Sequence, residues 1–260
     1  MSALRTVVPL ALGIAVLALW EFLVRHYNVP VYLLPGPAAI AQAFADDFAT
    51  LMAALWGTLS IAILAFLLAV ASGVAMAILF SQSRIVELAL YPYAVILQVT
   101  PVIAIAPLIV IWIGYDHIGR ALLLLAWIVA FFPILSNTTL GLKSADRDLI
   151  DLFRLYGASR WQILTRLQLP GALPHLLAAM KISGGLALIG VIVAEFAAGT
   201  GTDSGIGWTI IESGNRLHIA TMFAALALLS LTGVAIFFAL SALEWALLHR
   251  WHESAVKRQA

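Results

Sequence analysis

The sequence contains no cysteine, and charged residues make up only 10% of its 260 residues. The absence of cysteine excludes disulfide bonds, a thiol nucleophile and a thiolate metal site. The scarcity of charge excludes an ordinary soluble protein, in which about a quarter of the residues are charged. The net charge is only +1, so the chain also lacks the basic excess with which proteins hold nucleic acids.

Hydrophobic residues, in contrast, make up 63% of the chain and gather in long runs. A membrane-spanning helix needs about 20 mostly apolar residues. Six runs meet this requirement, and they cover residues 6–24, 51–80, 88–114, 121–140, 182–198 and 220–243. The sequence therefore predicts an all-α membrane protein with six transmembrane helices.

Three of the runs have features that refine this prediction. The first begins near a basic residue, as a signal peptide does, but Trp20, Glu21 and Phe22 follow where small cleavage-site residues are needed. We therefore expect a retained helix. The second and third runs are longer than a span requires, and the third contains three prolines, so we expect tilting or local breaks.

The distribution of basic residues predicts the orientation. If the N-terminus is cytoplasmic, 11 of the 14 basic residues lie inside, and only Arg25, Arg120 and Arg216 lie outside. The positive-inside rule then places both termini in the cytoplasm. We expect an N-terminal helix and outer amphipathic segment over residues 1–50, a transmembrane domain over 51–245 and a cytoplasmic tail over 246–260. The amphipathic segment, which begins at Pro37, lies at the outer interface or extends the second span.

The longest segment between runs, residues 141–181, is predicted to lie in the cytoplasm between spans four and five. Leu149, Leu152, Phe153 and Tyr156 recur at helical spacing and predict a short amphipathic helix. Gly157 follows directly, where a helix often ends in a left-handed residue.

A second short helix is predicted to begin at Ser159, because Ser159 and Gln162 have the spacing of a capping box. Residues 167–170 are expected to close it, and Pro174 is expected to prevent its continuation. The segment is either an interfacial loop packed against the span ends or a docking surface for a cytoplasmic partner.

This segment resembles the EAA loop of bacterial ABC importer permeases. In that family Glu-Ala-Ala is followed by three residues, Gly, nine residues and Ile-x-Leu-Pro. The present chain has Asp151, Leu152 and Phe153, then Gly157 and residues 167–170 at the same spacing. It departs from the pattern in having Asp for Glu and bulkier side chains for the two alanines. Similarity to the nitrate, sulfonate and taurine branch extends along the chain, at residues 34–37, 101–107, 112–114, 132–134, 137–138, 169–174 and 194–195.

The resemblance implies the membrane subunit of a type I ABC importer in the bacterial inner membrane. It also implies partners, namely a second permease copy, two cytoplasmic ATPase subunits that bind ATP and Mg, and a soluble or lipid-anchored binding protein. The implied cargo is nitrate, a sulfonate, taurine or a small heteroaromatic such as thiamine's pyrimidine precursor. No cofactor or enzymatic activity is expected of this chain, which has no Walker motif. The residues expected to couple to the ATPase are Asp151, Leu152, Phe153, Gly157, Ala158, Leu167, Leu169 and Pro170.

Five polar residues in or near the predicted spans are candidates for the transport pathway. They are Gln98, Thr100, Asn137, Thr138 and Glu195. An acidic residue at membrane depth is a candidate functional residue. Polar side chains in spans also form hydrogen bonds that hold helices together, and this is the alternative role. The histidines are scattered singly and predict no metal site, and residues 199–207 predict a flexible outer loop.

Two other classes of protein are compatible with the composition. A self-sufficient secondary transporter or channel would show charge pairs within the membrane or paired broken helices. A membrane-embedded enzyme would need converging acids, histidines or a nucleophile. Only Glu195 approaches the first description, so the importer subunit is the expected function.

Overall fold

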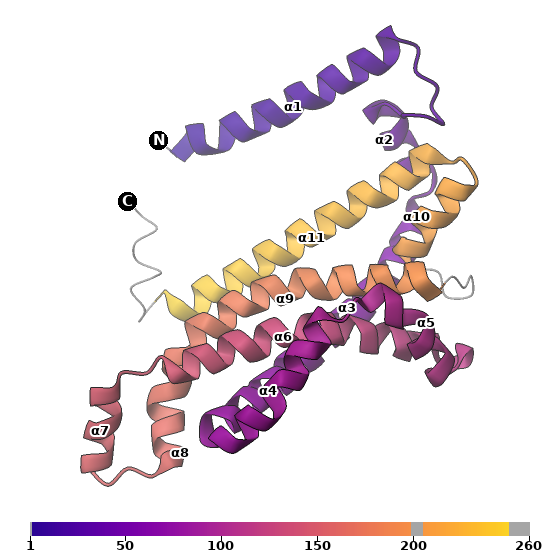
Figure 1. Cartoon of the computed structure of the whole chain (residues 1–260). Coiled ribbons are helices and arrows are strands. Elements are labelled where there is room, and N and C mark those ends of the chain that lie inside the picture. Colours follow the sequence, from indigo (N-terminus) through magenta and orange to yellow (C-terminus); the bar gives the residue numbers. More distant parts are fainter. Residues whose placement is uncertain (1, 199–204, 250–260) are drawn as a thin grey trace. The chain divides into compact units, whose positions relative to one another are not determined.

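The computed structural model describes residues 2–198 and 205–249. Nearly all of these residues are helical, and no strand occurs among them (Figure 1). The chain divides into two compact units. The smaller unit comprises Met1–Gly57 and Thr200–Leu231, and the larger unit comprises Thr58–Gly199 and Thr232–Ala260.

The smaller unit contains α1, α2, the start of α3, α10 and the start of α11. The helix bounds are Ser2–His26 for α1, Pro37–Asp46 for α2, Phe48–Gln82 for α3, Ile206–Asn215 for α10 and Ile219–Leu248 for α11. Helices α3, α10 and α11 meet in an apolar core, and Ile40 and Phe44 of α2 pack against it. The buried residues of this core are Leu51, Ala54, Leu55, Ile206, Ile210, Ala224 and Ala225. The predicted outer loop over 199–207 is therefore wrong at its end, because α10 begins at Ile206, and residues 199–204 lie outside the described residues.

A carboxylate on α1 fixes the start of α2. Glu21 accepts a hydrogen bond from the backbone N–H of Ala38 at 3.0 Å, and it also forms an ion pair with Arg25. A Cβ at Gly36 would lie 2.6 Å from Glu21 Oε2 and would displace the carboxylate. Asp47 then ends α2 one residue before α3 begins, so the amphipathic segment is a separate helix.

The larger unit contains the rest of α3 and α11 and all the helices from α4 to α9. Their bounds are Arg84–Val99 for α4, Val102–Ile113 for α5, Tyr115–His117 for η1, Ile118–Lys143 for α6, Arg147–Leu155 for α7, Arg160–Ile163 for α8, Leu164–Gln168 for η2 and Leu169–Ala198 for α9. Figure 1 shows α6 and α9 side by side, with α7 and α8 beyond their ends.

Small residues bring the backbones of α6 and α9 close together. A Cβ at Gly190 would lie 2.8 Å from Ala126 Cα, and the hydroxyl of Ser183 donates a hydrogen bond to the carbonyl of Ala130 at 2.8 Å. Small side chains and interhelical hydrogen bonds of this kind hold membrane helices together. α6 and α9 are thus closely packed within the larger unit.

Five helices of the described chain are long and apolar enough to cross a membrane: Val7–His26, Phe48–Gln82, Tyr115–Lys143, Arg160–Ala198 and Ile219–Leu248. The third predicted run is instead two helices, α4 and α5, bent by 101° at Thr100 and Pro101, and it makes a sixth span if the bent pair is one span. The reason for the break is local. Thr100 precedes a proline, which disfavours helical backbone at Thr100, and its ψ is 122°.

The predicted end of the second short helix is wrong. The second short helix does not close at residues 167–170, and Pro174 lies inside α9, so the fifth span is longer than the predicted 182–198. The chain continues through a π-helical turn, η2, in which the N–H of Leu169 bonds the carbonyl of Leu164, five residues earlier. This wider turn ends at Gln168, two residues before Pro170. Proline has no N–H to donate, and the wider turn allows the helix to continue through it.

Candidate functional site

The segment formed by α7, Gly157 and α8, hereafter the α7–α8 segment, has the helix–turn–helix form that the sequence predicts. At its start, Asp146 caps α7 by accepting a hydrogen bond from the N–H of Asp148 at 2.8 Å. At the end of α7, the N–H of Gly157 bonds the carbonyl of Arg154, and the N–H of Ala158 bonds the carbonyl of Phe153. These two bonds form a Schellman motif, with Gly157 at φ 74° as its left-handed residue.

The capping box of α8 is also present. Ser159 accepts a hydrogen bond from the N–H of Gln162 at 3.2 Å, while the side chain of Gln162 accepts one from the N–H of Ser159 at 2.7 Å. Only Ser159 follows Ala158 before α8 begins, so the C-terminal motif of α7 leads directly into the cap of α8. The angle between the two helices is therefore set by local hydrogen bonds.

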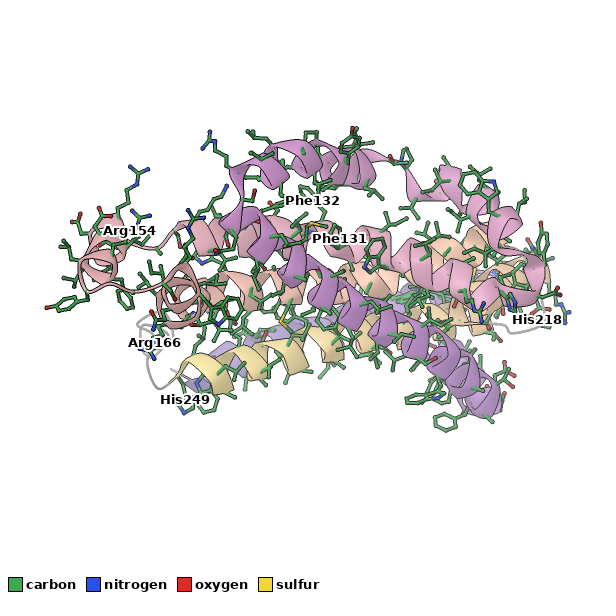
Figure 2. The ribbon with its side chains drawn as sticks, turned by 90° about the horizontal axis from the view of Figure 1, so that it is seen from below. Phe131, Phe132, Arg154, Arg166, His218 and His249 are labelled. Atoms are coloured by element: carbon green, nitrogen blue, oxygen red, sulfur yellow. The ribbon has the colours of Figure 1, made fainter. Side chains whose placement is uncertain are left out.

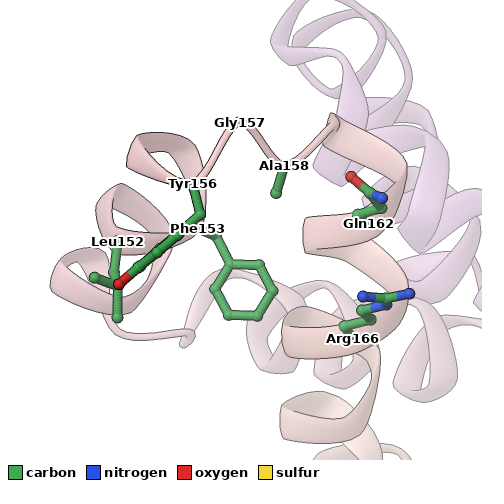
Figure 3. A pocket seen from close by; sticks show the side chains of 7 residues that line it. All are labelled: Leu152, Phe153, Tyr156, Gly157, Ala158, Gln162 and Arg166. Carbon is green, nitrogen blue, oxygen red and sulfur yellow. The ribbon is translucent and has the colours of Figure 1, made fainter.

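The two helices enclose a shallow hollow of about 380 Å³ (Figure 3). It is lined by Leu152, Phe153, Tyr156, Gly157, Ala158, Gln162 and Arg166. Apolar side chains around it remain exposed, and Leu155 and Tyr156 are each 85% exposed. α7 lies outside the candidate membrane spans, whereas α8 begins the span Arg160–Ala198. An exposed apolar surface with charged surroundings is typical of a binding site for another protein.

Charges of both signs surround the hollow. Asp151 and Arg154 form an exposed ion pair at 3.0 Å on α7. Figure 2 shows Arg154 and Arg166 at the same end of the larger unit. Asp151 is the residue that stands where the EAA pattern has its glutamate.

The predicted coupling residues fall into two groups. Asp151, Leu152, Phe153, Gly157 and Ala158 gather on α7 and its turn, and all but Asp151 line the hollow. Leu167, Leu169 and Pro170 lie on the returning helix, where Leu169 packs against the core of the larger unit.

The sequence did not identify Gln168 as the residue that connects η2 to α6. The amide of Gln168 donates a hydrogen bond to the carbonyl of Leu142 at 3.2 Å. Nothing in the local pattern distinguishes Gln168 from a solvated glutamine, because its acceptor lies 26 residues away.

The five pathway candidates occupy different environments. Gln98 is exposed on α4, whereas Thr138 is buried on α6. The side chains of Thr100 and Asn137 bond carbonyl oxygens of their own helices, those of Ile96 and Pro133.

Glu195 is 6% exposed and accepts a hydrogen bond from the hydroxyl of Thr58 at 2.6 Å. This bond joins α9 to α3. Glu195 therefore forms a hydrogen bond between helices, which is the second of the two roles considered for the polar residues of the spans. Sequence reasoning did not identify Thr58, whose only signal was a hydroxyl within an apolar run. Among the described residues, no group of histidines and carboxylates is arranged to hold a metal ion.

Comparison with known proteins agrees with this arrangement. Residues 69–247 match the family described as the inner membrane component of binding-protein-dependent transport systems. The chain is 34% identical to the formylaminopyrimidine transport permease protein ThiX of Halalkalibacterium halodurans, over 92% of this chain and 94% of the relative. It is 31% identical to the putative aliphatic sulfonates transport permease protein SsuC of Bacillus subtilis, over 86% of this chain and 80% of the relative.

The fold is shared with a solved transporter. Inward-facing structures of the methionine ABC transporter MetNI match with a TM-score of 0.65 and 21% identity, over 75% of this chain and 95% of the matched chain. The resemblance to ABC permeases of the sulfonate and taurine branch is confirmed, and a self-sufficient secondary transporter is not supported. The relatives are named as transport permease proteins.

Proposed function

Because this chain belongs to the family of inner membrane components of binding-protein-dependent transport systems, we propose that it acts as a homodimer driven by two ATPase subunits. The ATPase subunits bind the α7–α8 segment, and a binding protein delivers a small solute to the opposite face of the membrane. Both termini of the chain lie in the cytoplasm. In this arrangement the permease moves the solute, and its partners supply selection and energy.

The observation that carries this proposal is the exposed, preorganised α7–α8 segment. Two helices joined by a Schellman motif and a capping box present Leu152 and Tyr156 to solvent. A preorganised apolar surface loses little conformational entropy when it enters a groove on a partner. Closure of the ATPase dimer would displace this segment as one body and rock the attached helices, α6 and α9, between outward- and inward-facing states.

The first test is whether an ATPase subunit binds this surface. Leu152→Asp should weaken co-purification of the ATPase by about tenfold or more, because binding would desolvate the new charge. The measurement is the amount of ATPase recovered with the affinity-tagged permease from detergent-solubilised membranes.

Leu217→Asp is the matched control. Leu217 is also exposed, but it lies between α10 and α11 and has φ 60°, a conformation that aspartate accepts more readily than leucine. Equal recovery of the ATPase with wild type and both variants would contradict binding at the α7–α8 segment.

The proposed orientation has its own test. Because the chain has no cysteine, a single cysteine introduced at Tyr32 or at Arg147 can be labelled without background. Tyr32 is exposed between α1 and α2, and Arg147 begins α7. An impermeant maleimide should label Tyr32→Cys in intact cells and Arg147→Cys only after permeabilisation. The reverse pattern would overturn the orientation.

The substrate is proposed at the level of chemical class. ThiX is named for a heteroaromatic pyrimidine and SsuC for aliphatic sulfonates, and we propose that this chain carries a small solute of one of these two kinds. Titrating the binding protein that works with this permease with formylaminopyrimidine, taurine, an alkanesulfonate and nitrate would choose between them. Binding of nitrate alone, or of none of these four, would reject both classes.

We further propose that Gln98 and Thr100, at the broken α4–α5 pair, are closer to the pathway than Glu195. The support for this ranking is that Gln98 is exposed and Thr100 stands at the break, whereas Glu195 is buried against Thr58.

A further inference from the structure

The α7–α8 segment leaves α6 directly after a charged residue that contacts another helix. Lys143 is the last residue of α6, and it forms an ion pair with Glu87 in the first turn of α4. The side chain of Glu87 is 22% exposed, and that of Lys143 is 46% exposed. The pair therefore connects the point where the α7–α8 segment begins to the start of the broken α4–α5 pair.

The helical turn η2, which follows the α7–α8 segment, also contacts the last turn of α6. Gln168, in η2, donates its hydrogen bond to the carbonyl of Leu142, the neighbour of Lys143. Leu142 and Leu164 are both fully buried in the core that also contains Phe80. The chain on either side of the α7–α8 segment is thus held to the last turn of α6, so a displacement of the segment would act on that turn.

From Glu87, α4 runs as a continuous helix to the break. Its 16 residues give a length of about 24 Å, and the chain bends by 101° at Thr100 and Pro101. Tyr91 of α4 packs on Phe132 of α6, with ring centroids 6.2 Å apart, so the two helices also touch nearer the middle of α4. A pull at Glu87 would then turn α4 about this aromatic contact and move the break.

We propose that the Glu87–Lys143 ion pair is a coupling link, which transmits displacement of the α7–α8 segment to α4 and the break at Pro101. This role rests on the proposed function, since it requires an ATPase that displaces the segment. An exposed ion pair contributes little to stability. Its loss should therefore leave folding and ATPase binding intact and appear in the ratio of transport to ATP hydrolysis.

The experiment uses the complete transporter, with its ATPase and binding protein, reconstituted in liposomes. Glu87→Gln and Lys143→Gln should each lower the solute transported per ATP hydrolysed by about fivefold or more, the lower end of typical coupling between sites. The double variant Glu87→Lys with Lys143→Glu restores an ion pair of reversed polarity, and it should recover at least half of the wild-type ratio.

Glu212→Gln is the control, because it breaks an exposed ion pair with Arg216 on α10, in the smaller unit. It should leave the ratio unchanged. Wild-type ratios in both single variants, or failure of the charge-reversed double variant to recover, would overturn the coupling link. A wild-type permease that recovers no ATPase would instead overturn the proposed function, so the two failures are distinguishable.

Discussion

Gly157→Val should separate ATPase binding from membrane assembly. Gly157 has φ 74°, and a side chain in left-handed backbone costs about 1–2 kcal/mol, with valine among the least tolerated residues. No heavy atom lies within 4 Å of the position that a Cβ would take at Gly157, so the penalty comes from the backbone and not from a clash. The Schellman motif would open, and α7 would lose its fixed angle to α8.

The expected result is normal insertion into the membrane, since none of the spans is altered, with strongly reduced ATPase recovery or hydrolysis without transport. The measurements are co-purification of the ATPase and solute uptake into liposomes. Gly114→Val is the matched control, because Gly114 also has a positive φ, 90°, and open space, but ends α5. Equal loss of ATPase recovery in both variants would mean that strain, and not the position of Gly157, causes the effect.

Gly190→Val should destabilise the larger unit itself. The added Cβ would lie 2.8 Å from Ala126 Cα, a backbone atom that cannot rotate away. α6 and α9 would have to separate at this point, and overpacking of this kind costs about 1–3 kcal/mol. The hydrogen bond from Ser183 to the carbonyl of Ala130 lies farther along the same contact and would lengthen.

Gly190→Val is expected to have a lower midpoint of thermal unfolding. The midpoint is measured in detergent, with size-exclusion chromatography used to monitor unfolding. Gly185→Val is its control on the same helix, since no heavy atom lies within 4 Å of a Cβ placed there. A midpoint for Gly190→Val equal to that of Gly185→Val would show that α6 and α9 do not pack closely at Gly190.

Local patterns in the sequence were enough to predict the α7–α8 segment. The left-handed glycine and the capping box depend on residues within a few positions of one another, so Gly157, Ser159 and Gln162 could be assigned from spacing alone. The apolar runs likewise predicted the long helices, because bilayer thickness sets the length of a span.

Contacts between distant residues could not be predicted in the same way. Thr58 and Glu195 are 137 positions apart, and Glu87 and Lys143 are 56 apart. No periodicity connects such partners, so neither pair has a signal in a single sequence. The wrong stop near Pro170 has a different cause. Proline ordinarily breaks a helix, but a widened turn before it allows this helix to continue.

That widened turn also bears on the direction in which the α7–α8 segment points. A π-helical turn holds one residue more than the α-helical ladder would need, as if a single residue had been inserted into a continuous helix. Each residue of an α-helix advances the chain by about 100° around the axis. An inserted residue that the turn did not absorb would rotate α8 by roughly that angle relative to α9, whereas loss of one residue from Leu164–Gln168 would return this turn to the α-helical ladder with little rotation. The π-helical turn thus holds an extra residue without redirecting α8, so the α7–α8 segment keeps its direction relative to α9.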